Sequence, residues 1–294
     1  MTSNTAAPPA WRDSNRHLQI LRAAEDGGYG VLAAIAYNIE NILGLIQAAE
    51  VTRSPLILQF FPWAITFSNG LLVRAAAEAI SRSTVPISLH LDHAQDEALI
   101  RLAADTLPFD SIMVDMSHHE HDENLRRTAE LVEYCSRRGI ATEAEPGRIE
   151  GGEDGIMDTQ DLEGSKTSVD IAGEFVATGV DVLAPAVGNV HGEYGPDGPQ
   201  LDLELLKILR RSIPGHVPIA LHGTNGFPAE LMQQCIACGV RKINVNKLVL
   251  DDYMQHLSAN AASQQLTSLM EDGVQKVASL TARWMGICGS AGKA

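Results

Sequence analysis

Residues 86–100, PISLHLDHAQDEALI, decide the expected fold because they join a buried strand to a helix through a cluster of polar residues. The apolar start of the segment has the length of a strand, and its end begins an amphipathic helical pattern. Between the two stand Asp92 and His93, a carboxylate and an imidazole at the point where the strand should end. The segment therefore predicts one strand followed by one helix, with polar side chains at the junction.

The same alternation of apolar runs and helical stretches recurs along the whole chain, at intervals of roughly 25 to 35 residues. The eight expected strands are residues 31–37, 55–60, 87–91, 111–116, 141–144, 180–187, 218–221 and 242–245. Eight strand and helix units predict a closed parallel (β/α)₈ barrel, and a doubly wound open sheet is the alternative.

Composition narrows the choice of partners and location. The 294 residues include 37 acidic and 22 basic side chains, and the net charge of −15 repels phosphate backbones, so nucleic acid is not an expected partner. No apolar run approaches the roughly 18 residues of a membrane span. Residues 1–16 lack the apolar stretch of a signal peptide and are expected to be disordered or loosely packed. The cytoplasm is the expected location.

The expected barrel covers residues 17–250, and residues 251–294 form a helical extension that is longer than one closing helix requires. Two explanations of the extra length stay open: a helical pair that packs on another subunit of a homodimer or homotetramer, or a tail folded back on its own barrel. Cys235 and Cys238 have C-x-x-C spacing, but they lie in a helical pattern without a second pair, and we interpret them as packing residues.

Polar residues follow several of the expected strands, where a barrel of this kind carries its chemistry. These residues are Asp92, His93, Glu143, Glu145, His191, His222 and Asn244. Three imidazoles with an open fourth position are a typical catalytic zinc set, so His93, His191 and His222 are the predicted ligands of a divalent ion. Imidazole also binds cobalt, nickel and iron, which remain alternatives to zinc.

Side-chain alternation along the third strand gives Asp92 a role beside this ion. His90 and Asp92 share one face of the strand, so Asp92 is expected to point into the mouth of the barrel and exchange a proton with a substrate oxygen. The alternative is that Asp92 caps the next helix, a place for which Asp96 competes. We expect His90 to pack inside the barrel. We interpret the histidine-rich segment 118–121 as a helix start rather than a site.

Six segments, taken in order, resemble the motifs of class II, metal-dependent fructose-bisphosphate and tagatose-bisphosphate aldolases. They are SLHLDHAQD, VDMSHHEHDENL, TEAEPGRIEGGEDG, APAVGNVHGEYG, IALHGTNG and GVRKINVN, and the similarity extends from about Tyr29 to Asn246. The resemblance implies a (β/α)₈ barrel and a divalent ion, usually zinc, on His93, His191 and His222.

The resemblance also implies roles for four more residues. Asp92 corresponds to the residue that exchanges a proton with the aldehyde oxygen, and Asn244 to the asparagine that steadies the enediolate. Glu153 corresponds to the base at the ketose-derived carbon, and Glu145 to a carboxylate that binds the ion in an alternate position. The implied reaction is reversible aldol cleavage of a ketose bisphosphate or related hydroxy-ketone. A Schiff base between a lysine and the substrate is the other known way to stabilise the carbanion that aldol cleavage leaves. Neither Lys242 nor Lys247 is needed for this purpose beside three histidines that hold a metal ion.

The chain departs from the family pattern where phosphate should bind. Gly195 stands at the lysine position of an H-G-x-Y-K pattern, the HGTNG segment replaces H-G-G-S-G, and Asn246 and Lys247 replace D-T or A-T. FFPW after the second strand adds bulk near the mouth. The residues expected to bind substrate are Asn38, Gly192, Gly223, Thr224, Asn225, Asn246 and Lys247.

Two other classes of function remain alternatives. One is a barrel hydrolase in which the same ion activates water. The other is a catalytically silent, aldolase-like binding protein that keeps the barrel and uses the helical tail for contacts.

Overall fold

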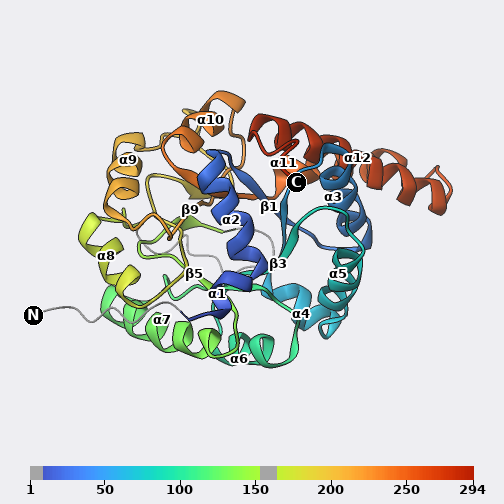
Figure 1. Cartoon of the computed structure of the whole chain (residues 1–294). Coiled ribbons are helices and arrows are strands. Elements are labelled where there is room, and N and C mark those ends of the chain that lie inside the picture. Colours follow the sequence, from blue (N-terminus) through green and yellow to red (C-terminus); the bar gives the residue numbers. More distant parts are fainter. Residues whose placement is uncertain (1–8, 153–163) are drawn as a thin grey trace, which may run out of the picture.

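Eight parallel strands close into a barrel in the computed structural model, which describes residues 9–152 and 164–294 (Figure 1). The strands follow one another around the barrel in chain order, and the last pairs with the first, so the (β/α)₈ prediction is confirmed. The barrel strands are β1 (Val31–Ile35), β2 (Leu56–Phe60), β3 (Ile87–Ala94), β4 (Ser111–Val114), β5 (Ala141–Ala144), β7 (Val182–Leu183), β9 (Ile219–Leu221) and β10 (Val240–Val245).

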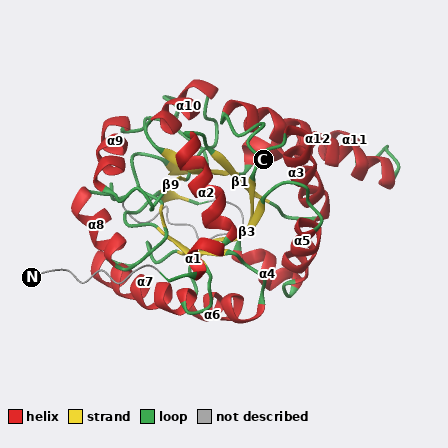
Figure 2. Cartoon of the chain, viewed as in Figure 1, coloured by secondary structure: helices red, strands yellow, loops and turns green. Residues whose placement is uncertain are grey.

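Helices surround the barrel as an outer ring, which covers the apolar outer faces of the strands (Figure 2). Their bounds are α1 (Trp11–Ser14), α2 (Arg16–Gly27), α3 (Ile39–Thr52), α4 (Pro62–Ser68), α5 (Leu71–Ser81), α6 (Glu97–Thr106), α7 (His121–Ser136), α8 (Val169–Ala177), α9 (Leu203–Ser212), α10 (Ala229–Ala237), α11 (Lys247–Asn260) and α12 (Leu266–Ile287). None of these helices combines the length and apolar composition that a bilayer crossing needs.

Helix α2 lies across one end of the barrel and closes it (Figure 1). Ile20, Leu21 and Ala24 of α2 pack with Val31 of β1 and Met113 of β4 in a buried apolar cluster inside the barrel. None of these α2 residues lines the two cavities that contain described residues of the predicted site.

The segment before α2 differs from the sequence prediction over its described part. Residues 11–14 form α1, and the Nε atom of Arg12 lies 2.6 Å from Oδ1 of Asp181. The side chain of Asn15 caps α2 by accepting a hydrogen bond from the backbone N–H of Leu18. The side chain of Asn15 also donates to the backbone oxygen of Asp110 at 2.9 Å, so a local cap and two contacts to distant parts of the chain order residues that we expected to be disordered or loosely packed.

One predicted strand is shorter than expected, and the chain that follows it forms part of a separate two-stranded sheet. β7 covers only two residues of the expected 180–187 strand, and the chain then forms β8 (Val190–His191), which pairs with β6 (Glu150–Gly151). Gly151 has a φ of +92°, and a Cβ atom there would lie 2.2 Å from the carbonyl oxygen of His191. A glycine at this position therefore lets the two segments approach beside His191.

The C-terminal helices fold back on the barrel along part of their length. α12 packs along α3, and the last residues continue this contact through a hydrogen bond from the N–H of Ala294 to the oxygen of Arg53, at 2.9 Å. The end of the hairpin where α11 meets α12 projects beyond the barrel (Figure 1). The structure thus combines a tail folded on its own barrel with a projecting tip, while a subunit contact there stays a prediction.

The close packing of α3 on α12 predicts a large effect of one added methyl group. A Cβ atom at Gly44 would lie 2.6 Å from Cβ of Val277 and 2.8 Å from the oxygen of Val274. Gly44→Ala is therefore expected to lower the free energy of unfolding by about 1–3 kcal/mol, measured by urea denaturation. Gly173→Ala in α8 is the control, because a Cβ atom there meets nothing within 4 Å. An equal loss of stability in both variants would contradict the packing argument.

Candidate active site

A local irregularity in β3 directs His93 into the mouth of the barrel. The strand continues to Ala94, beyond the expected end at Leu91, but its pairing with β4 shifts register between these two residues. His93 lies in this shift with a φ of +46°, a left-handed conformation that is rare for a residue with a side chain. Strict alternation would point His93 away from the face of Asp92, so the irregularity brings both side chains to the same cavity.

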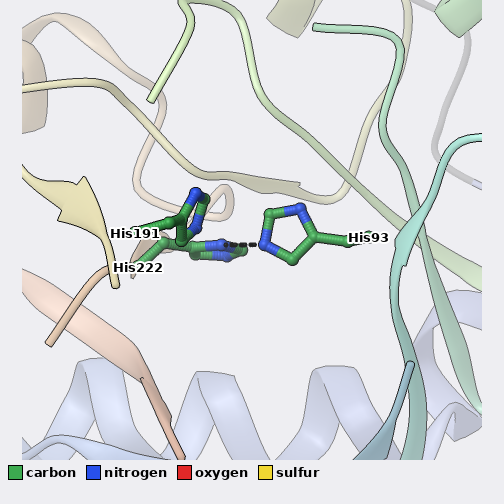
Figure 3. Close-up of side chains that lie close together, drawn as sticks. All are labelled: His93, His191 and His222. Atoms are coloured by element: carbon green, nitrogen blue, oxygen red, sulfur yellow. Dashed lines mark hydrogen bonds between the residues drawn. The ribbon is translucent and has the colours of Figure 1, made fainter. Parts of the chain in front are cut away.

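The three predicted histidines meet at this mouth (Figure 3). Nε2 of His93 lies 3.0 Å from Nδ1 of His222, and the ring centroids of His93 and His191 are 4.7 Å apart. One nitrogen from each ring lies within 4.8 Å of one nitrogen from each of the others, and all three residues are buried. They come from β3, from β8 and from the end of β9, three points that are far apart in the sequence.

Two buried carboxylates bind the outer nitrogens of His93 and His222, which are the ring nitrogens that face away from the other histidines. Oδ2 of Asp115 lies 2.8 Å from Nδ1 of His93, and Oε1 of Glu143 lies 2.7 Å from Nε2 of His222. Burial would raise the pKa of Asp115, but hydrogen bonds with His93 and Ser117 lower it to about 2. Because each carboxylate accepts a hydrogen bond from the N–H that it faces, the inner nitrogen of a neutral His93 or His222 ring is left with the lone pair that a metal ion needs.

This arrangement fits a divalent ion. The inner nitrogens of His93 and His222 are 3.0 Å apart, where a shared cation could replace the proton between them, and Nε2 of His191 is a buried atom with no hydrogen-bond partner among the described residues. Burial, together with the charges of His93 and His222, holds the pKa of His191 well below its usual range, which keeps this imidazole neutral as a ligand must be. Three imidazoles with carboxylate partners are typical of a catalytic zinc site.

The electrostatics around His93 also favour a positive charge at this point. Burial alone would lower the pKa of His93, but the charges of Asp92, Asp115 and Glu145 raise it to about 10. The acidic side chains that surround the ring therefore create a position where a cation is stabilised.

Asp92 lies beside the histidines and not at a helix terminus. Its carboxylate accepts hydrogen bonds from Nδ2 of Asn244 at 2.9 Å and from Nε2 of Gln59 at 3.1 Å. Burial would raise the pKa of Asp92, but the charges of His93 and Lys242 hold it well below its usual range. The cap of α6 is Asp96, whose Oδ1 accepts from the N–H of Ala98 at 2.7 Å.

A buried lysine inside the barrel fixes the side chain of Asn244 by a hydrogen bond. Nζ of Lys242 lies 2.6 Å from Oδ1 of Asn244 and 2.9 Å from Oε2 of Glu143, and the lysine side chain is completely buried. Since the amide oxygen of Asn244 accepts from Lys242, its NH₂ group is directed toward Asp92 and the histidines. His90 is buried in the same interior, as predicted, with its ring stacked on His17 at 5.3 Å.

Glu145 forms a second donor group with His93 and Asp115 near the three histidines. Its Oε1 accepts a hydrogen bond from the N–H of Ile149 at 2.7 Å. Burial and the charge of Asp115 raise the pKa of Glu145 to about 8. Glu153, the predicted carbon base, lies outside the described residues.

Two adjoining cavities open at this end of the barrel. The smaller one is lined by Asp92, His93, His191 and Asn244, together with the predicted substrate residue Gly223. The larger one has a volume of about 740 Å³ and contains the six other residues expected to bind substrate. They are Asn38, Gly192, Thr224, Asn225, Asn246 and Lys247. Asn246 lines both cavities, so the predicted substrate residues surround a space that adjoins the histidines.

Residues 15–293 match the family described as fructose-bisphosphate aldolase class-II. The chain belongs to this family. Members of the family are metal-dependent aldolases that cleave a carbon–carbon bond and release an aldehyde, and the chain is such an enzyme. These relationships give no support to the hydrolase or binding-protein alternatives.

Relatives of this aldolase carry consistent names. A Coccidioides immitis protein provisionally named fructose-bisphosphate aldolase is 49% identical over 288 residues, which cover 96% of this chain and 95% of that protein. A Streptococcus pneumoniae fructose-bisphosphate aldolase is 33% identical, with 94% and 98% covered.

Solved structures agree with the fold. A crystal structure from Coccidioides immitis, again provisionally named a fructose-1,6-bisphosphate aldolase, has a TM-score of 0.94 at 50% identity, covering 96% of this chain and 98% of that chain. The YdjI aldolase from Escherichia coli K12 has a TM-score of 0.82 at 30% identity, covering 95% and 98%.

Other polar clusters of the aldolase lie outside the two cavities. His121 begins α7, and its Nε2 lies 2.8 Å from Oε2 of Glu174. Among the described residues, the donor groups that could hold a metal ion include none of the histidines at 118–121. Cys235 and Cys238 are free and buried, in agreement with a packing role.

Sequence reasoning assigned no role to Asp115 and set Lys242 aside. Asp115 directly follows β4, so the rule that selected the other strand-end residues could also have selected it. Lys242 lies inside β10, and only barrel closure brings it to Glu143, so no local signal marked it.

Removal of the buried lysine should affect this aldolase in two separable ways. Lys242→Met leaves Glu143 buried without its cation, so the free energy of unfolding should fall by about 3–5 kcal/mol in urea denaturation. It also frees the amide of Asn244, so kcat should fall by about tenfold or more at normal metal content.

The double variant Lys242→Met/Glu143→Gln provides the control. It removes both charges and should recover much of the stability but not kcat. Full activity in the single variant would show that Lys242 does not position Asn244.

Proposed function

We propose that this aldolase reversibly cleaves a ketose phosphate or a related hydroxy-ketone, with a zinc ion on His93, His191 and His222. The observation that carries the proposal is the meeting of three buried imidazoles at the cavity that Asp92 and Asn244 line. When bound, the ion supplies a Lewis acid that stabilises negative charge on the ketone oxygen.

The residues around the cavity support the following sequence of steps. The carboxylate of Asp92 takes the proton from the hydroxyl group on the carbon that becomes the aldehyde. The carbon–carbon bond then breaks, the aldehyde leaves, and the electron pair remains on the ketose-derived fragment as an enediolate. The NH₂ group of Asn244, held in place by Lys242, donates to an oxygen of this fragment.

A proton returned to the enediolate carbon re-forms the ketone and completes cleavage. We assign this transfer to Glu153 on the family resemblance. We also assign Glu145 as an alternate ligand of the ion, which its place beside His93 and Asp115 supports.

The phosphate group nearest the reaction fits the larger cavity beside Gly192 and Thr224. The N-terminus of α11 lies here, and its N-cap residue Asn246 makes no side-chain capping bond. Helix N-termini attract anions through their backbone N–H groups and the helix dipole. Lys247, which also pairs with Glu193, adds a cation in place of the lysine absent at Gly195.

Turnover of ketose phosphates by the zinc-loaded enzyme, with trapping of released aldehydes, tests the proposal. An aldolase yields a trapped aldehyde and a smaller ketose phosphate, and a chelator stops the reaction. A hydrolase would yield no aldehyde, and bound metal without turnover of any hydroxy-ketone would indicate a silent protein. Either of these results would contradict the proposed function.

We further infer a cytoplasmic homodimer or homotetramer with contacts at the projecting tip of α11 and α12. Leu266, at the start of α12, is 70% exposed, which supports a contact there. All four cysteines are free, which agrees with a reducing compartment. Sedimentation equilibrium of the wild type and of Leu266→Asp tests the assembly, and a monomeric wild type would contradict it.

A further inference from the structure

The lining of the larger cavity includes two chemically different groups of residues. One group is the proposed phosphate site described above, formed by glycine-containing loops and the start of α11. The other group, which we call the apolar wall, consists of Tyr37, Trp63, Leu250, Met254 and Leu257, and the polar residues Asn38, Asn41 and Tyr253 also line the cavity. Tyr37 and Trp63 follow β1 and β2, and the other three residues of the apolar wall lie on successive turns of α11.

The apolar wall belongs to an aromatic cluster that reaches the histidines. The ring centroid of Tyr37 lies 6.1 Å from that of Trp63 and 6.2 Å from that of Phe61. Phe61 in turn lies 6.3 Å from His93. This continuity of ring contacts shows that Phe61 and Trp63, which follow β2, belong to an apolar cluster beside the reacting centre.

A hydrogen bond ties the apolar wall to the two cavities. The hydroxyl of Tyr37 accepts from Nδ2 of Asn246 at 3.0 Å, and Asn246 lines both cavities. Met254 is 60% exposed, so its side chain retains a large apolar area that a bound group can cover. A substrate that reaches from the histidines into the larger cavity therefore meets the apolar wall.

The charges around the larger cavity leave little support for a second phosphate. Within residues 9–152 and 164–294, the charged side chains that line it are Lys247 and Asp251, and no arginine is among them. A phosphate group carries up to two negative charges and is typically held by arginine or lysine. If Lys247 serves the first phosphate, the described lining offers the rest of the substrate one charged side chain, that of Asp251, together with uncharged polar groups and the apolar wall.

We propose that the aldehyde half of the substrate is unphosphorylated and carries an apolar or aromatic group that packs on the apolar wall. This proposal rests on the proposed aldol function and specifies its substrate class. In the synthetic direction, the enediolate carbon forms a bond to the aldehyde carbon, and the aldehyde oxygen takes the proton held by Asp92. The reaction requires no further reactant.

Condensation of dihydroxyacetone phosphate with three aldehydes tests the proposal. We expect kcat/KM for 3-phenylpropanal to exceed that for glyceraldehyde 3-phosphate by about tenfold or more, with glyceraldehyde between them. An equal or higher value for the phosphorylated aldehyde would overturn the proposal. A preference for glyceraldehyde over 3-phenylpropanal would also overturn it, because the apolar wall would then contribute nothing.

Exchange of a donor proton with solvent deuterium, measured without aldehyde, separates this proposal from the proposed function. Absence of both exchange and product would reject the aldol function itself. Exchange with a preference for the phosphorylated aldehyde, or exchange without product from any of the three, would reject only the aldehyde class.

Variants of the apolar wall supply a second readout that does not depend on the absolute rate. Trp63→Ala and Met254→Ala should each lower the ratio of kcat/KM for 3-phenylpropanal to that for glyceraldehyde by about tenfold. Gln255→Ala is the matched control, because Gln255 is exposed on the same helix and does not line the cavity. The control should keep the wild-type ratio, and an unchanged ratio in both wall variants would contradict the proposal.

Discussion

His191→Ala is expected to lose its bound metal and to lower kcat for aldol cleavage by about a thousandfold or more. Of the three predicted ligands, His191 is the one whose Nε2 atom has no hydrogen-bond partner among the described residues, so a bound ion would be the main partner of this atom. Two remaining imidazoles would hold the ion poorly, and negative charge on the ketone oxygen would lose its stabilisation. Metal content after dialysis, measured by mass spectrometry, and kcat measured on the same sample test both effects.

An exposed histidine away from the site supplies the control for this experiment. His216 lies in the loop before β9, outside both cavities. His216→Ala should keep the wild-type metal content and kcat. Wild-type metal content and turnover in His191→Ala would remove His191 from the ligand set.

Asp92→Ala is expected to keep its metal and to lower kcat by about 10²–10⁴-fold, the range of a lost acid or base. The imidazoles of His93 and His222 keep their carboxylate partners, Asp115 and Glu143, so the ligand set should stay in place. The substrate hydroxyl, in contrast, loses the group that accepts its proton. Metal content and kcat again provide the measurement.

A neighbouring aspartate distinguishes this role from a structural one. Asp96 caps α6, so Asp96→Ala should cost about 1 kcal/mol of stability and leave kcat near the wild-type value. Loss of metal in Asp92→Ala would instead identify Asp92 as a ligand, and an unchanged kcat would remove it from the reaction.

The barrel could be predicted because the evidence for it is local. Apolar runs separated by amphipathic stretches are a property of short windows, and all eight expected barrel strands are present. The ordering of residues 11–16 could not be predicted in this way, because it depends on contacts such as that of Arg12 with Asp181, 169 positions away. The early end of β7 has a similar origin, since β8 pairs with a segment from another loop.

The candidate site was predictable to the extent that its residues stand at strand ends. His93, His191 and His222 were found by this rule, and barrel closure brings them together. The rule did not explain how His93 turns inward, which depends on the register shift in β3. It also missed Lys242, because the neighbouring sequence does not indicate that the side chain of a charged residue inside a strand is buried.

Anomalous diffraction at the zinc edge, from crystals of the zinc-loaded enzyme, tests whether three imidazoles share one ion. We expect a single strong peak at about 2.0–2.1 Å from one nitrogen of each of His93, His191 and His222. A peak at another place, or a zinc-loaded, active enzyme with these three rings turned apart, would contradict the account.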